Sequence, residues 1–159
     1  MATATNSLGK ITTYSYDENT NVLNWVKYPE DTDATKTVYT YDQMYRQTKI
    51  ASTTDTGLNM SVEYTYSDDD YLTRVKTPKT TYIFTYGDFG LRTSVKIGSR
   101  TLASYRYTDD RNFYLEGLDY SNGDSVDYTY DDKGRILSAT YEDGDTVAYA
   151  YSTGNGSLC

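Results

Sequence analysis

Two aromatic side chains separated by one residue, the second always tyrosine, recur seven times along the chain. Successive second tyrosines lie 25, 25, 20, 21, 23 and 21 residues apart. A period of this length is typical of repeat architectures, in which each unit packs against its neighbours. The repeat-defining positions are Tyr14, Tyr16, Tyr39, Tyr41, Tyr64, Tyr66, Phe84, Tyr86, Tyr105, Tyr107, Tyr128, Tyr130, Tyr149 and Tyr151.

The two-residue spacing predicts a β-strand in each repeat. On a strand, residues two apart point to the same face of the sheet. Thr separates the pair at 39–41, 64–66 and 128–130, and both Thr and Tyr favour strands. A helix would not place residues two apart on one face.

A turn and a second strand-like run follow each aromatic pair. In the clearest copy Asp131 can open the turn through its carboxylate, and Gly134 can adopt the positive φ that closes it. Gly123 follows Asn and Gly144 follows Asp, both of which are hairpin signals. The sequence therefore predicts an all-β meander of about thirteen or fourteen antiparallel strands, each about 6–7 residues long.

The turns vary between copies. The turn-defining residues are Asp17, Asp42, Gly90, Asp131 and Gly134. Thr20, Tyr45 and Arg111 fill the glycine position in other copies and do not readily adopt a left-handed conformation. A different turn type is expected at those three.

Composition alone would suggest disorder. Leu, Ile, Val and Phe make up only 26 of the 159 residues, and the net charge is −8. The 20 tyrosines contradict that interpretation, because disordered chains are poor in aromatic residues. We expect tyrosine ladders on one face to replace an aliphatic core, with Thr, Ser, Lys49, Lys76 and Lys96 on the other face.

Several functions are excluded by composition. Histidine is absent and Cys159 is the only cysteine, which rules out imidazole catalysis, zinc–thiolate sites and an internal disulfide. The acidic balance argues against nucleic acid, and no apolar run approaches the length of a membrane span. The carboxylates of Asp68–Asp70 are the best calcium candidate, but turn chemistry explains them. No catalytic residue, metal site or cofactor is predicted.

The copy at 128–137, Tyr-Thr-Tyr-Asp-x-x-Gly-Arg-Ile-Leu, resembles the tyrosine–aspartate (YD) repeat of the Rhs family. That family includes bacterial Rhs polymorphic toxins, wall-associated proteins, the shell subunits of Tc toxins and animal teneurins. The resemblance implies tandem β-hairpin repeats in one continuous twisted sheet, forming an arc of a hollow shell. It places a lead-in at 1–11, seven repeats at 12–157 and a tail at 158–159.

The resemblance also implies a structural role. Shells of this family encapsulate or display an effector in secreted or surface-exposed proteins, so flanking repeats of a larger chain and a toxin cargo are the expected partners. Asp-Pro motifs mark the self-cleaving core of the family. None occurs here, since Pro29 follows Tyr28 and Pro78 follows Thr77. The chain is therefore expected not to be an enzyme.

Two further possibilities involve surfaces. The tyrosine face, with Tyr128 and Tyr130 as its possible ligand residues, could bind carbohydrate or a cell surface, because aromatic rings stack on sugars. The alternative is that these tyrosines pack against each other. The edge strands, expected near Tyr14–Tyr16 and Tyr149–Tyr151, lack proline and predict self-association.

Overall fold

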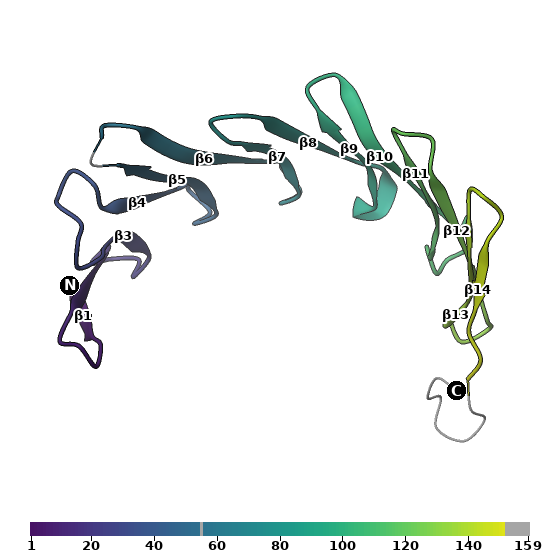
Figure 1. Cartoon of the computed structure of the whole chain (residues 1–159), viewed down its shortest axis with the longest axis horizontal. Helices are drawn as coiled ribbons and strands as arrows, with labels where there is room; N and C mark the ends of the chain where they lie inside the picture. Colours follow the sequence, from purple (N-terminus) through teal and green to yellow (C-terminus); the bar gives the residue numbers. More distant parts are fainter. Residues whose placement is uncertain (55, 152–159) are drawn as a thin grey trace. The chain divides into compact units, whose positions relative to one another are not determined.

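The computed structural model describes residues 1–54 and 56–151, which form an all-β, antiparallel sheet whose strand order equals chain order (Figure 1). A single turn of 3-10 helix, η1 (Asp88–Gly90), is the only helical element of the described residues. The strands are β1 (Ala2–Thr5), β2 (Ile11–Tyr16), β3 (Leu23–Lys27), β4 (Thr37–Tyr41), β5 (Gln47–Thr53), β6 (Asn59–Tyr66), β7 (Leu72–Lys76), β8 (Thr81–Tyr86), β9 (Arg92–Ile97), β10 (Arg100–Tyr107), β11 (Leu115–Tyr120), β12 (Ser125–Tyr130), β13 (Ile136–Tyr141) and β14 (Thr146–Ala148). The predicted fold class is confirmed.

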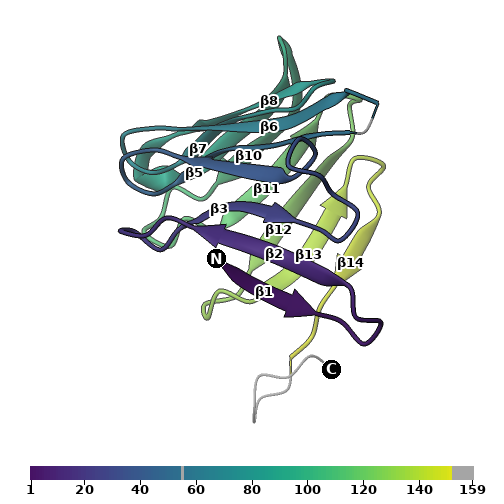
Figure 2. The ribbon, with the colours of Figure 1, turned by 90° about the vertical axis from the view of Figure 1, so that its left-hand side faces the viewer.

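The chain divides into two compact units, Met1–Tyr82 and Ile83–Cys159. In the first unit β1 to β7 pair successively, and Figure 2 shows β1, β2 and β3 side by side. The predicted N-terminal edge near Tyr14–Tyr16 is wrong, because Ala2 pairs with Tyr14 and β1 becomes the edge. The expected lead-in at 1–11 thus contributes a strand of its own.

The second unit contains β9 to β14 and most of β8. Its strands β9 to β14 also pair with their neighbours in the chain, all antiparallel. The last strand that the structure describes, β14, pairs with β13 through Ala148 and Ser138. The end of the predicted repeat array and the predicted tail at 158–159 lie outside the described residues.

A β-bulge recurs at the second tyrosine of the repeats. In the hairpin of β12 and β13, Thr129 pairs with Ser138 but Tyr130 pairs with Ile136, so Leu137 is left without a partner in the register. The same one-residue shift precedes Tyr16, Tyr41, Tyr66 and Tyr107. A bulge adds one residue to one strand and strengthens the local twist.

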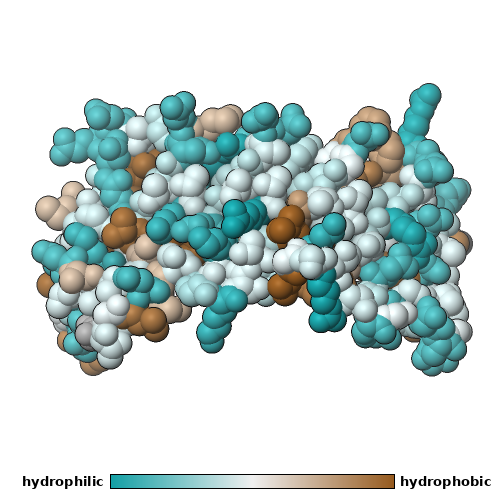
Figure 3. Space-filling model, turned by 90° about the horizontal axis from the view of Figure 1, so that it is seen from above, coloured by the Kyte–Doolittle hydropathy of each residue, from teal (hydrophilic) through white to brown (hydrophobic). Residues whose placement is uncertain are grey.

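The buried core of the described residues is small. Its buried hydrophobic residues are Val26, Ala103, Val126 and Ala139. All four lie on the tyrosine face: Val26 is opposite Tyr14, and Ala139 is opposite Tyr128. On the face drawn in Figure 3, hydrophobic side chains form small separate spots among polar ones. Half-buried tyrosines therefore provide much of the packing that aliphatic residues provide elsewhere.

The opposite face carries ionic ladders. Lys49 pairs in register with Glu63, which in turn pairs with Lys76. The Glu63 carboxylate lies 3.8 Å from the Lys49 ammonium and 3.1 Å from the Lys76 ammonium. The predicted placement of both lysines opposite the tyrosines is confirmed, since Lys49 pairs with Thr40 between Tyr39 and Tyr41.

Candidate functional site

In five repeats, the hydroxyl of the second tyrosine donates a hydrogen bond to a backbone carbonyl of the preceding repeat. The donor–acceptor distances are between 2.7 and 3.0 Å. The pairs are Tyr41 with Leu23, Tyr66 with Gln47, Tyr107 with Arg92, Tyr130 with Leu115, and Tyr151 with Ile136. Sequence reasoning placed these tyrosines on one face but did not anticipate this bond.

Four of the five acceptor carbonyls, those of Leu23, Gln47, Leu115 and Ile136, belong to the register partners of the bulged tyrosines. Leu115, which accepts from Tyr130, is the register partner of Tyr107. Ile136, which accepts from Tyr151, is the register partner of Tyr130. A bulge disrupts the ladder of backbone hydrogen bonds, and a buried carbonyl without a donor is unfavourable. In these five repeats the tyrosine hydroxyl supplies such a donor and joins the repeat to the one before it.

The turn after Tyr130 is organised by its aspartate. Asp131 Oδ1 accepts the backbone amides of Lys133 and Arg135 at 2.9 Å each, and Oδ2 lies 2.7 Å from the Arg135 Nε atom. The Arg135 amide and side chain lower the pKa of the Asp131 carboxyl, although desolvation opposes them. The Arg135 guanidinium also lies 4.3 Å from the ring centre of Tyr151 in the next repeat.

The same arrangement occurs around Asp42. The Nε atom of Arg46 lies 2.7 Å from Asp42 Oδ2, and its guanidinium lies 4.9 Å from the ring centre of Tyr66. Arg46 also forms an ion pair with Asp70 in the next turn. Asp17 instead accepts hydrogen bonds from the amides of Asn19 and Thr20 and from the Thr20 hydroxyl. A carboxylate, a guanidinium and an aromatic ring thus link successive repeats twice in the described chain.

Positive φ angles mark the ends of these turns. Gly134 has a φ of 77°, and a β-carbon there would overlap the ring of Tyr114. Tyr45 has a φ of 60°, so the expectation that it avoids the left-handed region is wrong. The positive φ falls on Asn21 rather than Thr20 and on Phe113 rather than Arg111. In the fourth repeat, η1 gives a positive φ to both Phe89 and Gly90.

A hollow of about 590 Å³ lies on the tyrosine face of the second unit. We name it the acidic tyrosine hollow. Its apolar walls are Tyr120, Val126, Tyr128 and Tyr141, and Asp124, Ser125, Glu142 and Asp143 complete its lining. Burial raises the pKa of the Tyr128 hydroxyl, and the neighbouring hydroxyls of Tyr120, Tyr141 and Tyr149 add to this effect.

The two tyrosines predicted as a ligand face have different surroundings. Tyr128 borders the acidic tyrosine hollow, whereas Tyr130 borders a smaller hollow of about 320 Å³, which Tyr128 also lines. The ring of Tyr130 stacks on that of Tyr114 with 4.8 Å between centres, and its hydroxyl is bonded to Leu115. Tyr130 is thus engaged in packing. Sequence reasoning missed Tyr120 and Tyr141, because they lie outside the repeated motif.

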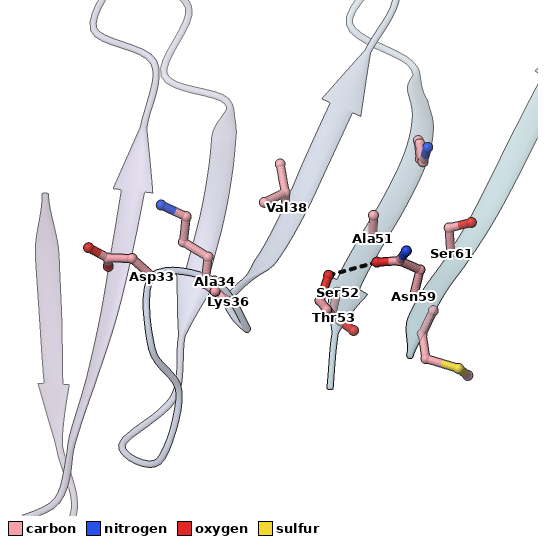
Figure 4. A pocket seen from close by; sticks show the side chains of 11 residues that line it. Asp33, Ala34, Lys36, Val38, Ala51, Ser52, Thr53, Asn59 and Ser61 are labelled. Carbon is pink, nitrogen blue, oxygen red and sulfur yellow. Dashed lines mark hydrogen bonds between the residues drawn. The ribbon is translucent and has the colours of Figure 1, made fainter. Parts of the chain in front are cut away.

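The first unit has a more polar hollow of about 320 Å³ on the face opposite the tyrosines (Figure 4). Val38 and Ala51 form its floor, Asp33 and Lys36 lie at one side, and the Asn59 side chain accepts a 2.9 Å hydrogen bond from Thr53. The Lys36 ammonium lies 4.7 Å from the ring centre of Trp25, the only tryptophan. The lining residues Lys36, Thr53 and Asn59 are thus engaged in contacts with neighbouring side chains.

Within residues 1–54 and 56–151, no three acidic side chains are grouped so that they could hold a metal ion. That part of the chain also has no helix with the length and apolarity needed to cross a bilayer. Cys159 lies outside the described residues.

Tandem β-hairpins with recurring bulges define a repeat sheet, and solved chains of Tc toxins share this fold. This chain aligns over 99% of its length with 9% of a chain in the Photorhabdus luminescens Tc holotoxin pore, a TccC3 variant, with TM-score 0.75 and 17% identity. The match to TcdB2–TccC3 without its hypervariable C-terminal region has a TM-score of 0.74 and 17% identity, and it covers 99% of this chain and 9% of that chain. The match to TcdB2–TccC3–Cdc42 has a TM-score of 0.60 and 12% identity, and it covers 98% of this chain and 10% of that chain.

The chain therefore spans about a tenth of the chains that it matches. No protein-family model matches the sequence, and no curated protein sequence matches it. The structural similarity confirms the predicted fold. It also agrees with the resemblance to the Rhs family, among which Tc toxin shell subunits are counted.

Proposed function

We propose that this chain is a non-catalytic segment of an Rhs/YD-repeat shell, an arc of wall that encapsulates or displays an effector or toxin. The parent protein is bacterial and is secreted or exposed at the cell surface. In it, flanking repeats continue the sheet, and the cargo is a separate part of the assembly. No enzymatic role is proposed for the repeats.

The hydrogen bonds between successive repeats support this proposal most strongly, and each place where such a bond connects two repeats is called a junction below. Each bond from a second tyrosine to a bulge carbonyl joins one repeat to the next with the same geometry, so the arrangement extends by addition of further copies. The similarity to chains of Tc toxins is consistent with such a wall. A thin sheet with four buried hydrophobic residues in its described part is suited to enclosing space rather than to building a catalytic cleft.

The sequence encoded on either side of this chain tests the proposal. Further aromatic–x–Tyr repeats leading to an Asp-Pro core and a variable C-terminal segment would support it, whereas unrelated flanking domains would refute it. In the parent protein, limited proteolysis should spare the C-terminal segment. A wall weakened by Tyr130→Ala should expose that segment to protease.

The acidic tyrosine hollow favours a second candidate, a carbohydrate- or cell-surface-binding module. Its aromatic walls and carboxylates are groups that stack on sugar rings and accept hydrogen bonds from sugar hydroxyls. A glycan array probed with the wild-type chain and with Tyr128→Ala tests this function. Binding that Tyr128→Ala abolishes, without loss of fold, would favour it over the purely structural role.

A further inference from the structure

The acidic tyrosine hollow is built by two successive hairpins in the same way. Tyr120 ends β11 and Tyr141 ends β13, 21 residues later, and each is followed by a tight turn. The amide of Gly123 donates to the Tyr120 carbonyl at 3.1 Å, and the amide of Gly144 donates to the Tyr141 carbonyl at 2.9 Å. Matched turns therefore place matched rings on one face of the sheet.

These two rings remain accessible. Tyr120 is 45% exposed and Tyr141 is 47% exposed, whereas Val126 between them is only 6% exposed. Val126 is the register partner of Tyr141 on β13 and of Leu118 on β11. The hollow thus has a buried aliphatic floor and open aromatic walls.

Carboxylates surround the hollow without a cation. Glu142 accepts a 2.8 Å hydrogen bond from the Ser125 hydroxyl, and Asp143 accepts one from the amide of Asp145 at 3.0 Å. Within the described residues, neither these two side chains nor Asp124 forms an ion pair, and the lining includes no Lys or Arg. The local potential is therefore negative, in a chain whose net charge is −8.

At two other places the chain itself supplies a cation to a carboxylate and an aromatic ring. At Arg135 a guanidinium lies between the carboxylate of Asp131 and the ring of Tyr151, and Arg46 is placed in the same way between Asp42 and Tyr66. Guanidinium groups stack on aromatic faces and pair with carboxylates at the same time. The acidic tyrosine hollow offers the ring and the carboxylate, but no residue of its lining offers the cation.

We propose that the acidic tyrosine hollow binds an arginine or lysine side chain of a basic polypeptide segment. The ammonium or guanidinium group contacts the tyrosine rings and pairs with Glu142 or Asp143, and the aliphatic stem packs on Val126. This binding property is independent of the shell role, since it requires neither flanking repeats nor an enclosed cargo.

Titration of the purified chain with a synthetic (Arg-Gly)4 peptide tests the proposal, with (Gln-Gly)4 as the neutral peptide. Isothermal titration calorimetry should detect binding of the basic peptide only. Tyr141→Ala should weaken the affinity about three- to fivefold, as expected for loss of one exposed cation–π contact, and Tyr141→Phe should preserve it. Tyr28→Ala, at a tyrosine of the first unit that is 53% exposed, should have no effect.

A matched pair of charge variants separates the site from general electrostatics. Glu142→Gln with Asp143→Asn, and Asp68→Asn with Asp69→Asn, each change the net charge by two units, from −8 to −6. The first pair should weaken peptide binding by about fivefold or more, and the second by less than twofold. Circular dichroism of each variant verifies that the fold is kept.

Three results would overturn the proposal: equal weakening by both charge pairs, no difference between Tyr141→Ala and Tyr141→Phe, or no binding of (Arg-Gly)4. Binding of a neutral glycan in place of the peptide would likewise overturn it and assign the hollow to carbohydrate.

Discussion

The hydroxyl of Tyr130 lies 2.7 Å from the carbonyl oxygen of Leu115 and connects two successive repeats. Tyr130→Phe removes only the donor and leaves a part-buried carbonyl unsatisfied, so it should lower the free energy of unfolding by about 1 kcal/mol. Urea denaturation followed by circular dichroism measures this change. Tyr120→Phe is the control, because that tyrosine is 45% exposed, and the same loss in both variants would contradict the role of the bond.

Gly134 combines a φ of 77° with the close ring of Tyr114. Gly134→Ala should therefore destabilise the chain more than Gly144→Ala, whose position has a φ of 88° but open space around the added methyl group. We expect about 1–2 kcal/mol for the left-handed backbone alone, with an additional loss at Gly134. Thermal unfolding of both variants measures the difference, and equal losses would show that the Tyr114 contact is unimportant.

Asp131 should make the stability depend on pH in the acidic range. Its folded-state pKa is lowered, first by the Arg135 amide and then by the Arg135 side chain, so its contribution is complete above the unfolded value of about 4. That contribution is lost as the pH falls through the lower folded-state pKa. Asp131→Asn should be less stable than wild type at pH 7, and the two should converge towards pH 2.

Urea titrations at several pH values test this convergence. Asp132→Asn serves as the control, because Asp132 is exposed and its carboxylate forms no ion pair within the described residues. A constant difference between Asp131→Asn and wild type from pH 7 to pH 2 would rule out the assignment.

Arg106 reaches across Gly117 to contact Asp119 and Asp127, and a β-carbon at Gly117 would overlap its guanidinium. Gly117→Ala should displace Arg106 and lower the stability by about 0.5–1 kcal/mol at low salt, with less effect at high salt because these groups are partly exposed. A double-mutant cycle with Arg106→Ala measures the coupling. Additive effects of the two substitutions would contradict the proposed contact.

The edge strand β1 predicts self-association. Its four residues, Ala2–Thr5, are all exposed and include neither lysine nor proline, the residues that discourage edge pairing. Light scattering during gel filtration should show a mass that rises with protein concentration, and Thr3→Lys should reduce that rise. A wild-type chain that stays monomeric at high concentration would refute the prediction.

The hairpins were predictable because their signals are local. Tyr128 and Tyr130 define a strand by spacing alone, and Asp131 and Gly134 define the following turn within four residues. The strand β1 was not predictable, since Ala2–Thr5 carries no aromatic pair and forms a strand only by pairing with β2. Whether such a segment forms a strand depends on the strand beside it more than on its own residues.

The junctions and the acidic tyrosine hollow depend on register, which local patterns do not reveal. Leu137 has no register partner on β12, although no glycine or proline marks the bulge. The carbonyl of Leu115 is 15 residues from the tyrosine that donates to it. Tyr120 and Tyr141 line the same hollow only because the turns that follow them have the same geometry. Tyr45 takes a φ of 60° where side-chain sterics alone would disfavour it, in a turn also held by Asp42.

The bonds between second tyrosines and bulge carbonyls have a mechanical consequence. Each bond spans one junction only, so a force applied along the strand order loads the junctions in series. Adding repeats lengthens such a structure without raising the force at which it breaks, because the weakest junction sets that force. A thicker hydrophobic core would share the load in parallel. In this sheet, a single Tyr→Phe substitution at one junction, such as Tyr130→Phe, would set the place where the strands separate.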